Sequence, residues 1–339
     1  MSQLLDSSDR VYRKKLHAAA QHMGCAATEA AVIERCRNQA NLRCDAIDPA
    51  LTPAERLVVL ADVASVHFEI VRSDAELDEV AARYASAGEL GFALRRVRFD
   101  AELLAAILRR QHAGAGERLF VALIDARRHK DAMAFFSQAH EVAHPVLEPQ
   151  LAFDFREETA KRDQWEALVD RVGSEMVFGG KLWADAASRT FRSPARLAVQ
   201  HLFDLKNSMA RDASLTAVAL AAANHTEHAA LVVWAGEERS KRDPAPALRI
   251  LQSTPNGIAS TEATFIHHKR RVPRSSPIAI SHVSGASCEG FEDLATWIGS
   301  DGRPLTSRQV WTAAYPMRGN VFAVIDFGPG GSWSSLATR

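Results

Sequence analysis

The stretch His140-Glu141-Val142-Ala143-His144 is the most informative part of this sequence. Apolar residues recur at helical spacing over residues 131–144, so we expect one amphipathic helix to carry it. Residues four apart lie on one face of a helix, and His140 and His144 can therefore direct their imidazoles at a single metal ion. Glu141 would lie beside that ion, where its carboxylate can accept a proton from a water molecule.

A third metal ligand has to come from another element, because a catalytic zinc site usually has three protein ligands and this helix supplies two. Glu166 is the preferred candidate, since it begins the next expected helix, beside the apolar ladder that runs from Trp165 to Met176. Gly173 on that helix has no side chain and would let the two helices approach closely. The other carboxylates that remain as alternatives are Glu148, Glu157, Glu158 and Glu175.

Capping motifs and apolar runs predict the elements that precede this pair of helices. Thr52-Pro53-Ala54-Glu55 and Ser73-Asp74-Ala75-Glu76 each combine an N-cap residue with a glutamate three positions later, a pattern that begins helices. Residues 66–71 alternate and residues 119–124 form an apolar run, so both are expected to be strands. A further helix is expected from Asp100 through Leu108.

The pattern changes towards the C-terminus. Helices are expected from Ser193 and from Ser214, and after residue 224 the chain shows short β-like runs separated by Pro, Gly, Ser and Asn. These runs cover residues 231–234, 247–251, 263–267, 278–281 and 321–327. Helical and β-rich segments that follow one another predict the α+β fold class.

The composition is that of an ordinary globular protein, with 47% hydrophobic and 24% charged residues, which excludes a disordered or fibrous chain. Lys plus Arg and Asp plus Glu each number 41, so the formal charge is zero and direct DNA binding is not expected. No apolar run approaches about 18 residues, and no membrane span is expected. The first residues lack a signal-peptide layout and four cysteines make no disulfide framework, so we expect a cytoplasmic protein with reduced thiols.

Two segments carry a resemblance to a known family. Residues 136–144 resemble the F-x-x-A-H-E-x-x-H segment of the ImmA/IrrE metallo-endopeptidases, and residues 166–178 are similar to that family's second block. The resemblance covers roughly residues 55 to 235 and implies Glu166 as the third ligand of a zinc ion, with manganese as the other possible metal. Residues 315–327 resemble, more weakly, the longer IrrE/PprI radiation-response branch, in which a GAF-like sensor domain follows the protease.

This chain also departs from the family pattern at several positions. Asp170 replaces the family's asparagine, and Gly179 stands about where its proline would be. Pro145 follows the second histidine directly and removes the amide that would bond the Glu141 carbonyl, so the metal-binding helix is expected to end early.

The resemblance implies a mainly helical, zincin-like metallopeptidase domain with a small sheet over residues 51–190. A helical segment of unknown role (1–50) would precede it. A helical bundle similar to a helix-turn-helix (191–235) and a β-rich, GAF-like sensor domain (236–339) would follow. The spacing of the bundle suits a helix-turn-helix, but its few basic residues favour packing or substrate docking.

The function implied is that of a cytoplasmic zinc endopeptidase that cuts a protein, by resemblance a helix-turn-helix transcriptional repressor, in a response to stress or to a mobile element. Glu141 would be the general base, with His140, His144 and Glu166 as metal ligands. The part of the expected strand from Phe120 to Ile124 could pair with an extended substrate. The alternatives are a non-catalytic, metal-containing regulator that acts by protein binding or ligand sensing, and a hydrolase of small amides.

Overall fold

The computed structural model describes residues 2–89, 104–127, 130–149, 164–192, 198–226, 228–240, 243–261, 266–298 and 303–328. Within these residues the chain combines helices with two separate sheets, the α+β class that was expected. It divides into two compact units, one of residues 1–183 with 209–214 and the other of residues 184–208 with 215–339. The sequence predicted domain boundaries at residues 50, 190 and 235.

Three helices begin the first unit and pack against later helices of the same unit. They are α1 (Ser2–Met23), α2 (Glu29–Asp45) and α3 (Pro53–Val63). The start of α3 confirms the predicted capping box, because the Thr52 hydroxyl accepts from the Glu55 amide and the Glu55 carboxylate accepts from the Thr52 amide. From residue 9 onwards, the apolar side chains that α1 buries are Tyr12, Leu16, Ala19, Ala20 and Met23.

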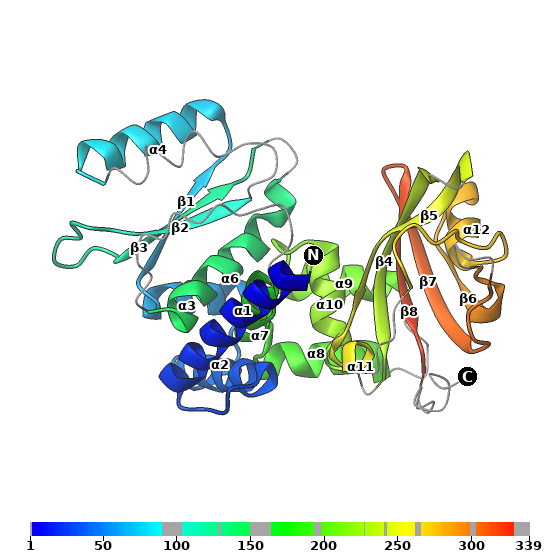
Figure 1. Cartoon of the computed structure of the whole chain (residues 1–339), viewed down its shortest axis with the longest axis horizontal. Coiled ribbons are helices and arrows are strands. Elements are labelled where there is room, and N and C mark those ends of the chain that lie inside the picture. The colour runs from blue at the N-terminus through cyan, green and yellow to red at the C-terminus, as the bar shows by residue number, and fades with distance from the viewer. Residues whose placement is uncertain are drawn as a thin grey trace. The chain divides into compact units, whose positions relative to one another are not determined.

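A three-stranded sheet follows in the order β1-β3-β2. Its strands are β1 (Val66–Val71), β2 (Ala105–Arg109) and β3 (Phe120–Asp125). β1 runs parallel to β3, and β2 runs antiparallel to it. Helix α4 (Asp74–Ser86) packs on one face through Leu77 and Val80, and α6 (Asp131–Leu147) lies along the other face (Figure 1).

Two expectations about this sheet are wrong. Residues 105–109 form a strand and not the end of a helix, because pairing with β3 satisfies their backbone while Ala106 and Leu108 pack into the core. Residues 100–103 of that expected helix lie outside the described residues. β3 is the central strand and bonds to a neighbour on both sides, so residues 120–125 offer no free edge to a substrate.

Helix α6 continues past Pro145 to Leu147, so the expected early end is also wrong. Pro145 removes only its own amide, and the amide of Glu148 donates to the carbonyl of His144, which closes one more turn. Helix α7 (Gln164–Phe178) packs closely on α6, as predicted, and ends just before Gly179.

The second unit is built on a five-stranded antiparallel sheet in the order β5-β4-β8-β7-β6. The strands are β4 (Ala230–Ser240), β5 (Asp243–Pro255), β6 (Cys288–Asp293), β7 (Gln309–Met317) and β8 (Asn320–Asp326). The remaining elements are α8 (Lys181–Arg192), α9 (Val199–Met209), α10 (Leu215–Ala223), α11 (Gly257–Thr261), α12 (Pro277–Ser284) and η1 (Leu294–Thr296).

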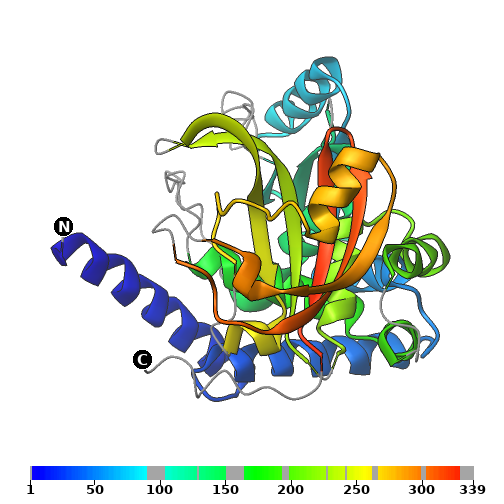
Figure 2. The ribbon, with the colours of Figure 1, turned by 90° about the vertical axis from the view of Figure 1, so that its right-hand side faces the viewer.

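Helices cover both faces of this sheet. α12 lies across β6, β7 and β8 on one face, as Figure 2 shows, and Ile278 and Trp297 join the core there. On the other face, the ring of Phe203 in α9 stacks edge-on against Tyr315. The indole N–H of Trp234 in β4 donates to the hydroxyl of Thr216 in α10.

One expected strand of the second unit is a helix. Residues 278–281 belong to α12, which the Ser276 hydroxyl caps by accepting from the Ile278 amide, and which ends at Gly285 with a left-handed φ of 66°. The apolar run was too short to separate strand from helix by its periodicity. Residues 263–265 of another expected strand lie outside the described residues. None of the described helices has the length and apolar character needed to cross a membrane.

Candidate metal centre

The metal centre is built where α7 lies directly against α6. A Cβ atom on Gly173 would be 2.6 Å from the Ala139 carbonyl oxygen and 3.1 Å from the His140 amide nitrogen. Any side chain larger than hydrogen would therefore force the two helices apart. This confirms the close approach predicted at Gly173, and it brings a carboxylate of α7 within reach of the histidines of α6.

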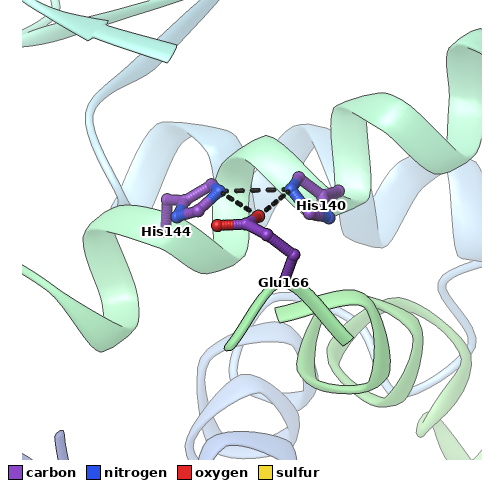
Figure 3. Close-up of side chains that lie close together, drawn as sticks. All are labelled: His140, His144 and Glu166. Carbon is purple, nitrogen blue, oxygen red and sulfur yellow. Dashed lines mark hydrogen bonds and ion pairs between the residues drawn. The ribbon is translucent and has the colours of Figure 1, made fainter. Parts of the chain in front are cut away.

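His140, His144 and Glu166 converge at one point, as Figure 3 shows. The Nε2 atoms of the two histidines are 3.1 Å apart. The Glu166 Oε2 atom lies 3.2 Å from Nε2 of His140 and 3.4 Å from Nε2 of His144. Two imidazoles and a carboxylate are ligands that zinc accepts, so these three side chains could hold a metal ion.

A second carboxylate orients His140. Asp170 lies four residues after Glu166 on α7, and its Oδ1 atom is 2.7 Å from Nδ1 of His140. A proton at Nδ1 that is donated to Asp170 leaves Nε2 with the lone pair that a metal needs. This contact was not predicted from the sequence, where Asp170 was noted only as a departure from asparagine. Its i, i+4 spacing from Glu166 was the available signal.

Glu148 lies on the far side of His144. Its Oε2 atom is 3.8 Å from Nδ1 of His144 and accepts a hydrogen bond of 3.2 Å from the indole of Trp165. Its Oε1 atom is 3.2 Å from the ammonium group of Lys15 on α1. That ammonium group also lies 4.9 Å from the centre of the Trp165 ring. Glu148 is thus near His144 without being one of the three converging groups.

The carboxylates strongly favour positive charge at this point. Burial alone would lower the pKa of His140, but hydrogen bonds to Asp170 and Glu166 outweigh it and raise that pKa to about 10. Burial would also lower the pKa of His144, but the carboxylates of Glu148 and Glu166 outweigh this effect and raise that pKa to about 9. Burial would raise the pKa of Glu166, yet the two histidines hold it well below its usual range. A group of side chains that favours positive charge in this way suits a divalent metal ion.

Glu141 lies between the two histidines in sequence and is only 3% exposed. Its charge contributes to raising the pKa of both His140 and His144, so it acts on the same site electrostatically. It is not one of the three groups that converge, which fits the role of a base better than that of a ligand.

The alternative ligands fall into two groups. Glu157 and Glu158 lie outside the described residues. Glu175 forms an ion pair of 3.7 Å with Arg37 of α2, and Glu148 forms the contacts given above. Among the described residues, the one group of histidine, cysteine and acidic side chains arranged to hold a metal is His140, His144 and Glu166.

No protein-family model matches this chain, and no curated protein matches it at a significant level. Among solved structures, a Mycobacterium tuberculosis transcriptional regulator matches it with a TM-score of 0.43 and 8% sequence identity. That match covers 93% of this chain and 81% of the other. A likeness at this score and identity carries no argument about function.

Proposed function

We propose that this chain is a cytoplasmic, zinc-dependent endopeptidase of the ImmA/IrrE type, with a zincin-like first unit. The observation that carries the proposal is the convergence of His140, His144 and Glu166, with the buried carboxylate of Glu141 one residue from the first histidine. Three protein ligands of these types are the donor set of catalytic zinc sites, which keep a further position open. Manganese is the other metal that these ligands would accept.

Each residue of the site has a defined role in this proposal. When bound, the metal ion polarises a carbonyl oxygen and makes water more acidic. Glu141 accepts a proton from the attacking water and passes it to the leaving amine. Asp170 holds the His140 ring in the orientation and protonation state that a ligand requires.

The substrate proposed is a protein, and by the resemblance of residues 136–144 it is a helix-turn-helix transcriptional repressor, cut in a response to stress or to a mobile element. The second unit would be a GAF-like sensor that regulates the cut. The five-stranded antiparallel sheet with helices on both faces supports that part of the proposal. The zero net charge gives no support to direct DNA binding.

The experiment compares zinc-loaded wild-type protein with Glu141→Gln in a cell extract that contains the native proteome. New protein N-termini are labelled and identified by mass spectrometry. We expect the wild type to create new N-termini in a small set of proteins, and Glu141→Gln to reduce this cleavage by about 10² to 10⁴. Glu141→Gln should still bind zinc, because Glu141 is not among the converging groups.

The same experiment separates the competing functions. Equal cleavage by both proteins would exclude Glu141 as the base. If neither protein creates new N-termini while both bind zinc, the metal belongs to a non-catalytic regulator that acts by protein binding or ligand sensing.

A further inference from the structure

The N-terminal helix α1 reaches the metal centre, although the sequence assigned no role to it. Its buried face docks on α2 and α7, and the Tyr12 hydroxyl donates to Glu29, which also accepts from Arg171 of α7. One turn further on, Lys15 lies 3.2 Å from Glu148 and over the ring of Trp165. The helix is therefore held in place beside the end of α6.

Glu148 is placed to act on His144 as Asp170 acts on His140. It follows His144 by four residues and lies at the C-cap of α6, with its Oε2 atom on the Nδ1 side of the His144 ring. The Nε2 side of that ring faces Glu166. Nδ1 of His144 is buried and has no hydrogen-bond partner among the described residues, and the Glu148 carboxylate lies 3.8 Å from it.

Two other groups hold Glu148 at this distance. The indole of Trp165 donates to the oxygen that faces His144, and Lys15 pairs with the other oxygen. An ammonium group on a carboxylate takes up part of its charge, so that less of this charge acts on the neighbouring histidine. The side chains of Lys15 and Glu148 are only about one quarter exposed, which limits the screening of their charges by water.

We propose that Glu148 is a positioning residue that favours the proton of His144 at Nδ1, and that Lys15 of α1 weakens this effect. This inference rests on the proposed metal centre and adds to it a link between α1 and the metal affinity. Glu148 is not itself proposed as a metal ligand, because it is not one of the three converging groups.

The test measures the dissociation constant of zinc by competition with a chromophoric chelator. Glu148→Gln keeps the size of the side chain and removes its charge, and we expect zinc to bind about 10- to 100-fold more weakly. The matched control is Glu175→Gln, the same change at an α7 carboxylate that pairs with Arg37 and is not one of the converging groups, and it should leave zinc binding unchanged. An NMR spectrum of ¹⁵N-histidine protein should show His144 protonated at Nδ1 in the zinc-loaded wild type and less uniformly so in Glu148→Gln.

The second arm tests Lys15. Lys15→Met should tighten zinc binding about two- to fivefold, as expected for loss of one partly screened charge, whereas Lys15→Arg should behave like the wild type. The gain should vanish in the double variant with Glu148→Gln, because Lys15 would act through that carboxylate. Arg37→Met, which removes a cation from the Glu175 pair, is the control and should change nothing.

The outcomes separate this inference from the metal centre itself. A wild-type protein that binds no zinc would overturn the proposed function. Normal zinc binding by Glu148→Gln, or an effect of Lys15→Met that persists without Glu148, would overturn only the inference. Complete loss of zinc in Glu148→Gln, as expected for a ligand, would also overturn it. Thermal unfolding of the metal-free variants shows whether each one is folded.

Discussion

Gly173 lies so close to Ala139 that a Cβ atom would come within 2.6 Å of the Ala139 carbonyl oxygen. The atom in the way is backbone within α6, and it cannot rotate aside as a side chain would. The separation of α6 and α7, and with it the distance from Glu166 to the histidines, therefore depends on this glycine.

Gly173→Ala should push α7 away from α6 and reduce zinc binding by at least tenfold, although alanine favours helices by about 1 kcal/mol over glycine. The measurement is zinc affinity by chelator competition, with helicity from circular dichroism. Gly290→Ala is the control, because its backbone has no left-handed φ and the nearest atom to its Cβ position is a Pro277 side-chain carbon at 3.7 Å, an ordinary contact distance. Full zinc affinity in Gly173→Ala would show that the two helices can separate without moving the ligands.

Asp170→Ala should weaken zinc binding about 10- to 100-fold, because His140 loses the acceptor at Nδ1 that lies 2.7 Å away. Asp170→Asn should lose less, since its amide oxygen can still accept that proton. Titration of metal-free protein with zinc gives both constants. Equal losses in the two variants would show that the negative charge of Asp170, which both remove, supports the metal and that its hydrogen bond does not.

Arg56→Met should destabilise the first unit by about 3 kcal/mol. The Arg56 side chain is 1% exposed, and its guanidinium donates to the carbonyls of Met176 and Val177 at the end of α7 and to Asn41. Helix ends leave such carbonyls without internal partners, and methionine cannot satisfy them.

Urea unfolding in the presence of a metal chelator measures this effect of Arg56 apart from zinc binding. The control is Arg118→Met, which removes an exposed ion pair with Asp62 and should cost less than about 1 kcal/mol. Similar losses in the two variants would mean that the buried hydrogen bonds contribute little.

Asp125 should make the stability of the first unit dependent on pH. Burial would raise the pKa of Asp125, but hydrogen bonds from Arg127 and Lys130 outweigh it and lower the pKa to about 2. A carboxylate with a lowered pKa in the folded state stabilises the protein above its unfolded pKa of about 4 and loses this contribution as the pH falls. The shift corresponds to about 2 kcal/mol at neutral pH, of which about half is lost by pH 3.

Asp125→Asn should accordingly be less stable than the wild type by about 2 kcal/mol at pH 7, and the gap should shrink towards pH 3. Urea midpoints at pH 7, 4 and 3 check this. A gap that stays constant with pH would assign the loss to altered packing and not to the charge of Asp125.

The elements that depend on local sequence patterns were predicted reliably. The helix around His140 and the capping box at Thr52 depend on residues within one or two turns, and both are found where they were predicted. Glu166 could be predicted as the third metal ligand because it begins the helix that follows the histidine helix, and because Gly173 allows these two helices to approach closely.

Tertiary contacts decided what local patterns could not. The segment 105–109 has spacing that also suits a helix, and only its pairing with β3 makes it a strand. Lys15 is some 130 positions from Glu148 in the chain, so no local motif could bring them together. A proline inside α6 was tolerated because the amide of Glu148 closes the following turn.

The path of β4 determines how the gene can be divided for expression. The strand runs from Ala230 to Ser240 and pairs with β8 over Ala230–Ala235 and with β5 from Leu231 to Ser240, so a cut at residue 235 would leave half of it on each fragment. Each fragment would expose unpaired backbone, and the C-terminal fragment would also lose α9, whose Phe203 ring covers Tyr315. Exposed strand edges of this kind promote aggregation, so insoluble products from a cut at residue 235 would reflect a broken sheet and not an unstable first unit.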